Sequence, residues 1–333
     1  MHTDKPAAVS VHIVTYNSAE DIGSCLEAVL AQTYPIAAIV VVDNASADDS
    51  LRRAALIKER VLERDNPAPA QAPAWVLLAN SANAGFAPAH NQAMAATASD
   101  YALVLNPDVV LAPDYIARLV RRMEADRSLG SATGLLVRKS DPATADSAGL
   151  TMNGIRRAFD RGAGEPAAQW SESGYVFGVS GAAALYSRRM VEDIAIEGQF
   201  FDADFFAYKE DVDVAWRARL YGWKSWFDAG ASALHERGWK EEGRSAKPLV
   251  IRRHSFINRY RMLLQNEPAR SLPWTLLKSL PYEAAVHGYL LLKEPRVPAA
   301  WGQLLRDLKP LLHKRRIIQG QAKRRRGHSP ATD

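Results

Sequence analysis

The amino-acid sequence predicts an α/β fold, in which a mixed, mainly parallel sheet is flanked by helices and followed by a helical C-terminal extension. Over the first hundred residues, short apolar runs alternate with segments whose apolar residues recur at helical spacing, which is typical of a parallel sheet. After about residue 245 the helical period dominates. With 47% hydrophobic and 24% charged residues, the 333-residue chain can form a packed core.

Local composition predicts each element of the N-terminal half. The run VSVHIVT is rich in β-branched residues and predicts a first strand. After it, Ile22, Leu26, Val29 and Leu30 recur at helical spacing. The same reasoning predicts strands at Val9–Thr15, Ile39–Val42, Trp75–Ala79 and Tyr101–Leu105, helices at Asp48–Glu63 and Pro88–Ala98, and a proline-rich loop at Asn66–Pro73.

The second half of the sequence is less regular. After Gly130 it predicts short strands and loops, with hairpins between residues 141 and 164. A loop from Phe200 then leads into a helix at Val212–Leu220, and a strand follows at Lys224–Phe227. From about Ser245, six prolines are expected to divide a helical segment into short pieces. The expected domains are 1–244, with halves at about 1–130 and 131–244, and an extension at 245–333.

Polar residues follow each of the first four predicted strands at the point where the strand ends. Parallel strands place their carboxyl ends at one edge of a sheet, where ligands bind, so these clusters predict a binding site. Asn, Asp and Ser are also common in turns and helix caps, which explains any single cluster equally well. The clusters are Tyr16–Asn17, Asp43–Asn44, Asn80–Asn83 and Asn106–Asp108.

Asp108 is a candidate ligand for a divalent cation. It lies after the fourth predicted strand, beside Asn106 and the turn-forming Pro107. A carboxylate oxygen there can hold Mg²⁺ or Mn²⁺ while phosphate oxygens take other positions around the ion. Asn-Pro-Asp is also an ordinary turn, and that alternative stays open.

Asp211 and His235 are the candidates from the second half. Asp211 follows Glu210 at the start of the predicted helix, and an aspartate with the ordinary pKa of about 3.9 is ionised at neutral pH and can act as a general base. Acidic residues also stabilise helix N-termini by about 0.3–1 kcal/mol, which explains the same pattern without any chemistry. His235 is a candidate third metal ligand, although a single histidine is more often structural.

Seven motifs, occurring in a fixed order, carry a resemblance to a known family. They are VHIVTYN (11–17), VVDNAS (41–46), NAGFAPAHN (83–91), LNPDVV (105–110), VSGAAALYSRR (179–189), FFAYKEDVDVAWRARLYGW (205–223) and HERG (235–238). Over residues 9–238 the chain resembles the family 2 inverting glycosyltransferases of the GT-A fold, in particular the bacterial rhamnosyltransferase-like group.

The resemblance implies a nucleotide-sugar site at the strand ends. Asp43 is expected on a pyrimidine base, and the other residues of the donor site are Tyr16, Asn17, Asn83, Gly85, Asn91 and Asn106. Asn106 replaces the first aspartate of the family's D-x-D element, so the expected metal affinity is lower than with two carboxylates.

The resemblance also implies the residues that carry the reaction. Asp108 takes the metal-binding position, His235 is a further metal ligand, and Asp211 is the general base. The acceptor is expected to lie beside Ser180, Gly181 and Glu210.

The implied activity is a single, inverting sugar transfer that uses Mg²⁺ or Mn²⁺. The leading donor is dTDP-L-rhamnose, with UDP-sugars next, and the acceptor is a saccharide hydroxyl, expected to be polyprenyl-diphosphate-linked, in bacterial cell-surface polysaccharide assembly such as that of O-antigen. The chain lacks the membrane spans and the Q-x-x-R-W element of the family's processive synthases. A non-catalytic sugar-nucleotide-binding or scaffolding protein of the same fold is the alternative.

Charge and apolar clusters near the C-terminal end predict a membrane contact. The range 314–326 holds seven basic residues and no acid, whereas the rest of the chain carries 35 basic and 37 acidic residues, which argues against a nucleic-acid partner. Leucines and aromatic residues between Leu272 and Trp301 suit a lipid interface. With one cysteine and no export signal in the sequence, the expected location is cytoplasmic, peripheral on the inner face of the membrane.

Overall fold

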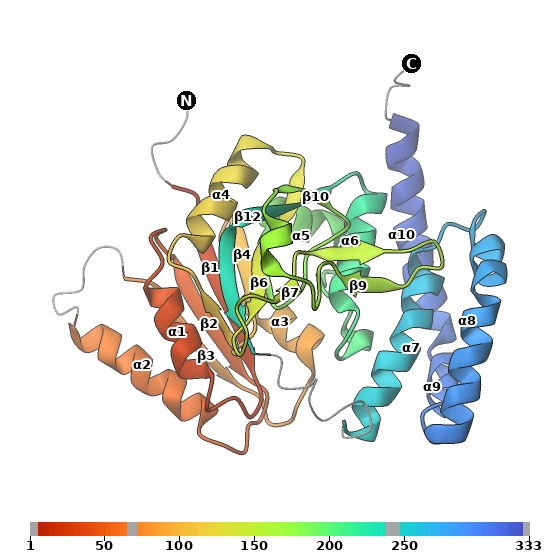
Figure 1. Ribbon diagram of the computed structural model, residues 1–333, viewed down its shortest axis with the longest axis horizontal. Coiled ribbons are helices and arrows are strands. Elements are labelled where there is room, and N and C mark those ends of the chain that lie inside the picture. The colour runs from red at the N-terminus through yellow and green to blue at the C-terminus, as the bar shows by residue number, and fades with distance from the viewer. Residues whose placement is uncertain (1–5, 65–71, 237–246, 329–333) are drawn as a thin grey trace.

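The computed structural model describes residues 6–64, 72–236 and 247–328 (Figure 1). Within these residues, a mixed sheet of ten strands forms the centre of the molecule, with the main strand order β10-β12-β6-β11-β4-β1-β2-β3. The strands of the sheet are β1 (Val9–Thr15), β2 (Ala38–Asp43), β3 (Ala74–Ala79), β4 (Tyr101–Leu105), β5 (Val109–Leu111), β6 (Leu129–Arg138), β7 (Ala145–Ser147), β10 (Gly174–Val176), β11 (Ala183–Ser187) and β12 (Lys224–His235).

The four N-terminal strands of the sheet run parallel. β1 lies between β2 and β4, and β3 pairs with β2, so that the carboxyl ends of all four strands meet at one edge. β11 is antiparallel to both β4 and β6, and it joins this parallel half to the half that contains β12. The observed architecture confirms the predicted fold class.

Helices cover both faces of the sheet (Figure 1). Side chains of β1 alternate between the two layers: Val11 and Ile13 pack in one core with α1 and α4, whereas His12 faces the other side, against Thr97. Short helical turns lie at η1 (Ala167–Trp170) and η2 (Ala203–Phe205), and β8 (Leu150–Met152) pairs with β9 (Ala158–Asp160) as a separate hairpin. The first six α-helices are α1 (Ile22–Leu30), α2 (Ser50–Arg64), α3 (Phe86–Ala95), α4 (Tyr115–Ala125), α5 (Arg188–Ile194) and α6 (Glu210–Leu220).

The predicted elements agree best with the structure where apolar residues recur at a regular spacing. The bounds of β1 and β4 agree with the predicted residues, and α1 contains the predicted apolar stripe. The sequence missed β6 and β11, which are buried on both sides and therefore lack alternation. The strand predicted at Lys224–Phe227 continues to His235 as β12, so its predicted end is wrong; the pairing shifts at a bulge between Asp228 and Ser232.

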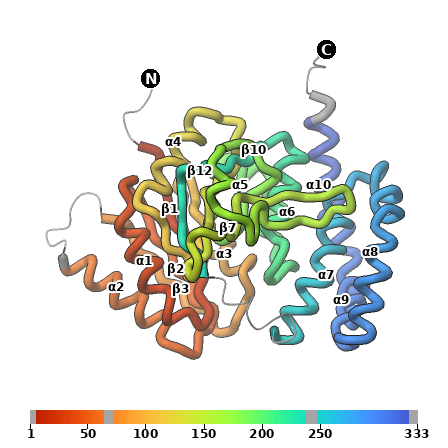
Figure 2. The backbone as a smooth tube through the Cα atoms, viewed as in Figure 1, coloured from red at the N-terminus to blue at the C-terminus, as the bar shows by residue number. Residues whose placement is uncertain are grey.

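Four helices are described between residues 247 and 328, and they lie together at one end of the molecule (Figure 2). They are α7 (Leu249–Asn266), α8 (Leu272–Lys293), α9 (Ala300–Arg306) and α10 (Leu308–His328). The expectation that each proline ends a helix is wrong for Pro281, which lies inside α8. Pro281 is exposed, so water can bond the backbone carbonyl that loses its partner there.

Two of these helices are bonded to the segment that precedes α6. In α7, the side-chain amide of Asn258 donates to the backbone carbonyls of Phe205, Ala207 and Tyr208. In α10, Lys314 lies 2.6 Å from Asp202. The C-terminal helices therefore position the residues around Asp211.

The basic segment Lys314–Arg326 belongs to α10, and several of its cations contact the rest of the protein. Lys314 pairs with acids of the central domain, Arg315 donates to a backbone carbonyl of α7, and Arg325 pairs with Asp193. Ile318, on the same helix, is fully buried. The basic side chains in these contacts are among those that were expected to contact a membrane surface.

Among the residues that the structure describes, no helix combines the length and the apolar composition needed to cross a bilayer.

Candidate functional site

Asp43 ends β2 at the carboxyl edge of the parallel strands. Its Oδ2 accepts a hydrogen bond from the backbone N–H of Ser46 at 3.0 Å. Its Oδ1 is buried and has no hydrogen-bond partner among the described residues. A buried carboxylate oxygen without a donor is costly, so it fits an N–H group supplied by a ligand.

Tyr16 and Asn17 follow β1 at the same edge. Asn17 adopts a left-handed φ of 52°, and its side-chain oxygen accepts from the backbone N–H of Ala47 at 2.8 Å. This bond ties the loop after β1 to the loop after β2. The Tyr16 side chain is 51% exposed, so its ring is free to stack on a planar ligand.

Asn83 and Gly85 shape the turn that starts α3. The side-chain oxygen of Asn83 accepts from the N–H of Gly85, whose φ is +91°. A Cβ on Gly85 would lie 2.6 Å from the carbonyl oxygen of Phe206, so only glycine fits there. Both ends of the Asn91 side-chain amide bond the backbone of Phe201, so Asn91 holds α3 against that segment.

Asp108 and His235 come together, as the sequence suggested. Asp108 Oδ1 lies 3.4 Å from His235 Nε2, and this buried oxygen has no hydrogen-bond partner among the described residues. His235 Nδ1 lies 2.8 Å from Asp146 Oδ2, a contact that fixes the orientation of the ring. Sequence reasoning missed Asp146 because it lies 89 residues away, in a region that reads as loops.

The electrostatics of His235 follow from its two acidic neighbours. Burial alone lowers the pKa of His235, but the neighbouring carboxylates of Asp108 and Asp146 outweigh burial and raise the pKa to about 9. The described residues contain no group of three or more His, Cys, Asp or Glu side chains that could hold a metal ion. Asp108 and His235 therefore form a two-residue candidate, with Asp146 behind the histidine.

Asp211 lies in the first turn of α6. Its Oδ2 accepts from the N–H of Gly181 at 3.2 Å, and its Oδ1 accepts from the N–H of Val212 at 2.7 Å. Burial raises the pKa of Asp211 above its ordinary value; the bond from Gly181 partly offsets this effect, and the nearby Asp160 adds to it. A carboxylate with a raised pKa is a stronger base at neutral pH than an exposed aspartate.

The turn Ser180–Ala182 connects Asp211 with the loop that bears Asp108. Gly181 bonds the Asp211 carboxylate, and the carbonyl of the next residue, Ala182, accepts from the N–H of Asn106 at 2.8 Å. Residues 103 positions apart in the sequence are thus linked through one buried turn at the end of β4. The arrangement supports the expectation that Asp108 and Asp211 serve one site.

Glu210 lies beside Asp211 and is buried. Burial and the Asp211 charge raise the pKa of Glu210 from 4.5 to about 8, and its Oε2 has no hydrogen-bond partner among the described residues. Glu210 therefore keeps its proton at neutral pH, because a second negative charge beside Asp211 is unfavourable in this buried place.

This raised pKa predicts a pH-dependent effect of Glu210→Gln on stability. Between pH 4.5 and about 8 the folded protein keeps a proton on Glu210 that the unfolded chain has released, so wild-type stability falls as pH rises through this window. The neutral glutamine removes that loss. We expect the melting temperature of the variant, relative to wild type, to be higher at pH 8 than at pH 5. The exposed Glu59→Gln is the control, and an equal difference at both pH values for Glu210→Gln would contradict the prediction.

The fold and these groups define a class of protein. A mainly parallel sheet presents an unbonded carboxylate oxygen, an exposed aromatic ring and an acid–imidazole pair at one edge, and the turn Ser180–Ala182 ties Asp211 of α6 to the loop that bears Asp108. Such an edge suits a nucleotide-linked substrate and a proton transfer.

Sequence comparison agrees: the profile of Glycosyl transferase family 2 matches residues 10–195, and the chain belongs to this family. The match includes the strand-end residues and the Ser180–Ala182 turn, and it ends before Asp211 and His235.

Individual relatives are distant. The chain is 22% identical over 224 residues to poly-beta-1,6-N-acetyl-D-glucosamine synthase of Staphylococcus aureus, an alignment that covers 67% of this chain and 48% of the relative. The chain thus spans about half the length of the curated relatives it matches.

Solved structures establish the GT-A fold. GalNAc-T7, solved with UDP, GalNAc and Mn²⁺, superposes with a TM-score of 0.58 at 15% identity, over 78% of this chain and 49% of that one. The mannosyltransferase PcManGT from Pyrobaculum calidifontis, in complex with GDP-Man and Mn²⁺, gives 0.54 at 18%, over 97% and 88%. S. aureus TarS gives 0.54 at 16%, over 95% and 54%.

Proposed function

We propose that this protein transfers a single sugar from a nucleoside diphosphate to an acceptor hydroxyl, with inversion at the anomeric carbon. The observation that carries the proposal is the linkage of Asp211, through Gly181 and Ala182, to the loop bearing Asp108. A base on α6 and a phosphate-binding group after β4 then meet on opposite sides of the reacting carbon.

In this mechanism Asp211 removes the proton of the attacking hydroxyl. Its two backbone hydrogen bonds fix the carboxylate, and burial keeps its basicity above that of an exposed aspartate. Attack opposite the leaving diphosphate gives inversion. Ser180, Gly181 and Glu210 surround the base and are the proposed acceptor-side residues.

Asp108 and His235 are the proposed holders of Mg²⁺ or Mn²⁺. Their chemistry fits, because a carboxylate oxygen and an imidazole nitrogen that has released its proton suit such ions, and Asp108 Oδ1 is buried without a hydrogen-bond partner among the described residues. A divalent cation bound there supplies positive charge for the leaving diphosphate. Asn106, beside Asp108, adds a neutral amide and no second carboxylate.

A pyrimidine donor is favoured by the geometry of Asp43. Uracil and thymine present one imide N–H, which matches the single unbonded Oδ1. Guanine presents two adjacent donors, and a bidentate match would need Oδ2, which already accepts from Ser46. Tyr16 is the proposed stacking surface for the base, and Asn17, Asn83 and Gly85 hold the loops around it.

The experiment that tests this function is a donor screen. With Mn²⁺ and Mg²⁺, release of nucleoside diphosphate is measured from dTDP-, UDP- and GDP-sugars. We expect the fastest turnover with dTDP-L-rhamnose and slower turnover with UDP-sugars. The preference for rhamnose is inferred from the resemblance to the rhamnosyltransferase-like group. Tighter binding of GDP than of dTDP and UDP would refute the pyrimidine assignment. Nucleotide binding without turnover of any donor would favour a non-catalytic binding or scaffolding protein.

We further propose that the acceptor is a saccharide on a polyprenyl diphosphate, reached from the cytoplasmic face of the membrane. The support is the outer face of α8, where large apolar side chains are exposed to solvent. The reaction belongs in this view to the assembly of a cell-surface polysaccharide.

A further inference from the structure

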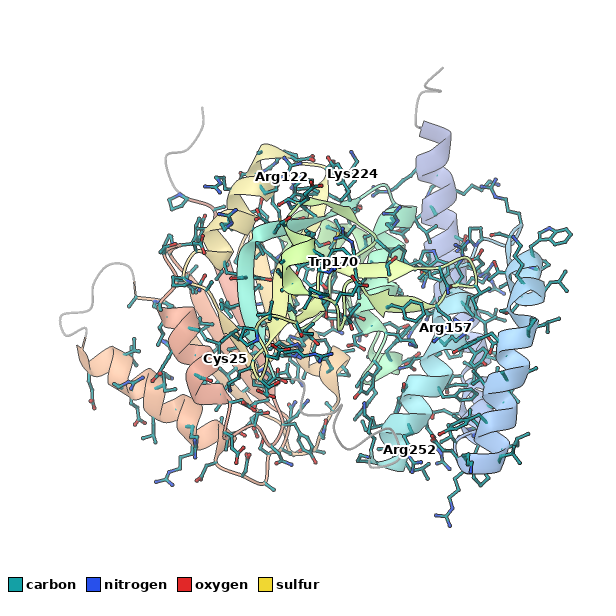
Figure 3. The ribbon with its side chains drawn as sticks, in the orientation of Figure 1. Cys25, Arg122, Arg157, Trp170, Lys224 and Arg252 are labelled. Carbon is teal, nitrogen blue, oxygen red and sulfur yellow. The ribbon has the colours of Figure 1, made fainter. Side chains whose placement is uncertain are left out.

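A cavity of about 410 Å³ lies beside the proposed base, between the β8–β9 hairpin and the helices α7 and α8. Lys209, which immediately precedes α6, lines it, and Asp211 follows two residues later. Arg157, labelled in Figure 3, enters from the hairpin where it reaches the C-terminal helices. The donor residues Asp43 and Asp108 are not part of its lining, so this cavity is separate from the strand-end site.

The cavity lining is cationic. Four cations line it: Arg156, Arg157, Lys209 and Arg259. Two of these have carboxylate partners, since Arg156 pairs with Glu267 and Arg259 with Glu283. Within the described residues, neither Arg157 nor Lys209 has a carboxylate at salt-bridge distance. Lys209 lies near the acids Asp211 and Glu210, which act on its charge, so Arg157 is the cation of the lining that lacks a nearby carboxylate partner among the described residues.

The uncompensated Arg157 is held in place by aromatic rings. Its guanidinium lies 4.4 Å from the ring centre of Tyr282 on α8 and 4.8 Å from that of Phe159 on the hairpin. The ring contacts orient the planar group while leaving its N–H donors available. A guanidinium of this kind matches a phosphate or diphosphate group, which accepts two parallel hydrogen bonds.

The lining acid Glu283 does not compete for such a ligand. Its Oε1 accepts from Arg259 at 2.8 Å, and its Oε2 accepts from the hydroxyl of Tyr260. Both oxygens of the carboxylate are therefore bonded on the cavity wall. An anionic ligand therefore meets mainly the charge of Arg157, with Lys209 as a second donor.

The helix that closes the cavity turns an apolar face to solvent. On α8 the inward positions include Thr275, Ser279 and Leu290. The outward positions are large and apolar, with exposed fractions from 56% to 82% at Trp274, Leu277, Leu280, Leu291 and Leu292. Such an inverted distribution is unfavourable in water and suits a lipid surface.

The charges around this face complement an anionic membrane. Lys278 and Lys293 are exposed on α8, and Arg270 and Arg296 are exposed at its two ends. Glu283 and Glu294, the acids of this stretch, face inward, and each is paired with an arginine of α7. The outer face thus carries cations and apolar groups and no acid between residues 270 and 296.

We propose that this cavity binds the phosphate or diphosphate group of a lipid-linked acceptor, while the outer face of α8 rests on the membrane that holds the lipid. Arg157 and Lys209 bind the phosphate, which places the attached sugar toward Asp211. The inference rests on the proposed function and names the site that selects its acceptor.

Flotation of the full-length protein with vesicles tests the proposal without any donor. One set of phosphatidylcholine vesicles carries a long-chain polyprenyl diphosphate, and a second set carries phosphatidylglycerol at equal surface charge. We expect the wild type to bind the diphosphate vesicles at least about tenfold more tightly than the phosphatidylglycerol vesicles, as charge-assisted hydrogen bonds require. Equal binding to both sets would mean that only phospholipid headgroups are recognised, and would overturn the proposal.

Variants of one arginine locate the effect. Arg157→Gln is expected to weaken binding to the diphosphate vesicles by about ten- to hundredfold. Arg157→Lys, which keeps the charge, should recover part of this loss, and Arg52→Gln, on the exposed side of α2, should bind as wild type. Wild-type binding by Arg157→Gln would refute the site.

Failure of this inference is distinguishable from failure of the proposed function. Release of nucleoside diphosphate from donor and water needs no acceptor, so its absence bears on the function alone. If the protein turns over a donor but Arg157→Gln binds the diphosphate vesicles as tightly as wild type, only the proposed acceptor site is rejected.

Discussion

Asp211→Asn is expected to lower turnover by roughly 10²–10⁴-fold while leaving donor binding nearly unchanged. This is the usual effect of removing a positioned base. The amide keeps the size of the carboxylate and can still accept one of the two backbone hydrogen bonds that Asp211 makes, so the local structure should persist. Steady-state rates and calorimetry with the nucleoside diphosphate measure the two quantities separately.

The contrasting variant is Asp108→Asn. Because Asp108 is the proposed metal ligand, we expect weaker metal-dependent nucleotide binding from it, and a surface control, Asp49→Asn, should match wild type in both assays. If Asp211→Asn abolished donor affinity while Asp108→Asn left it intact, the two roles would be reversed.

The second large effect is expected for stability, from Arg217→Met in α6. Arg217 is fully buried; its Nε donates to Asp213 at 2.8 Å, and its other nitrogens donate to the carbonyls of Ile194 and Phe200. Removing it leaves a buried carboxylate without its cation and two carbonyls without donors. Loss of one partner of a buried ion pair costs about 3–5 kcal/mol. Urea unfolding should show a corresponding fall in the free energy of unfolding.

Two further variants test the cause of that loss. Arg219→Met changes an exposed arginine two residues away on the same helix and should have a small effect. Replacing Asp213 with leucine in the Arg217→Met background removes the stranded charge and should recover part of the stability. A loss below about 1 kcal/mol for Arg217→Met would contradict the assigned role of the ion pair.

Several site residues were found from the sequence because each belongs to a short motif at the end of an element. Asp43 and Asp108 follow strands whose period is regular, and Asp211 begins a helix with an acidic first turn. Asn91 lies in such a motif too, yet its amide bonds the backbone of Phe201, 110 residues away. A motif fixes the position of a residue on its element, but it does not fix the partner that the side chain meets.

Residues whose role depends on partners far away in the sequence could not be recognised from the sequence. Asp146 orients His235 from 89 residues away, and Asn258 holds the segment before the base from 53 residues away. The seven basic residues near the C-terminal end read as a free patch, but Lys314 meets Asp202 across 112 residues. The spacing of apolar residues along the chain carries no information about such long-range pairs.

The sequence by itself determined the α/β order, the bounds of β1 and β4, and the candidate acids, because these depend on side-chain period and on turn chemistry within a few residues. Tertiary structure decided which acid orients His235, which cation beside Lys209 lacks a carboxylate partner, and which side of α8 is exposed. The physical reason is that charge pairing and burial depend on distances between elements, which the folded chain sets only when its helices close over the sheet.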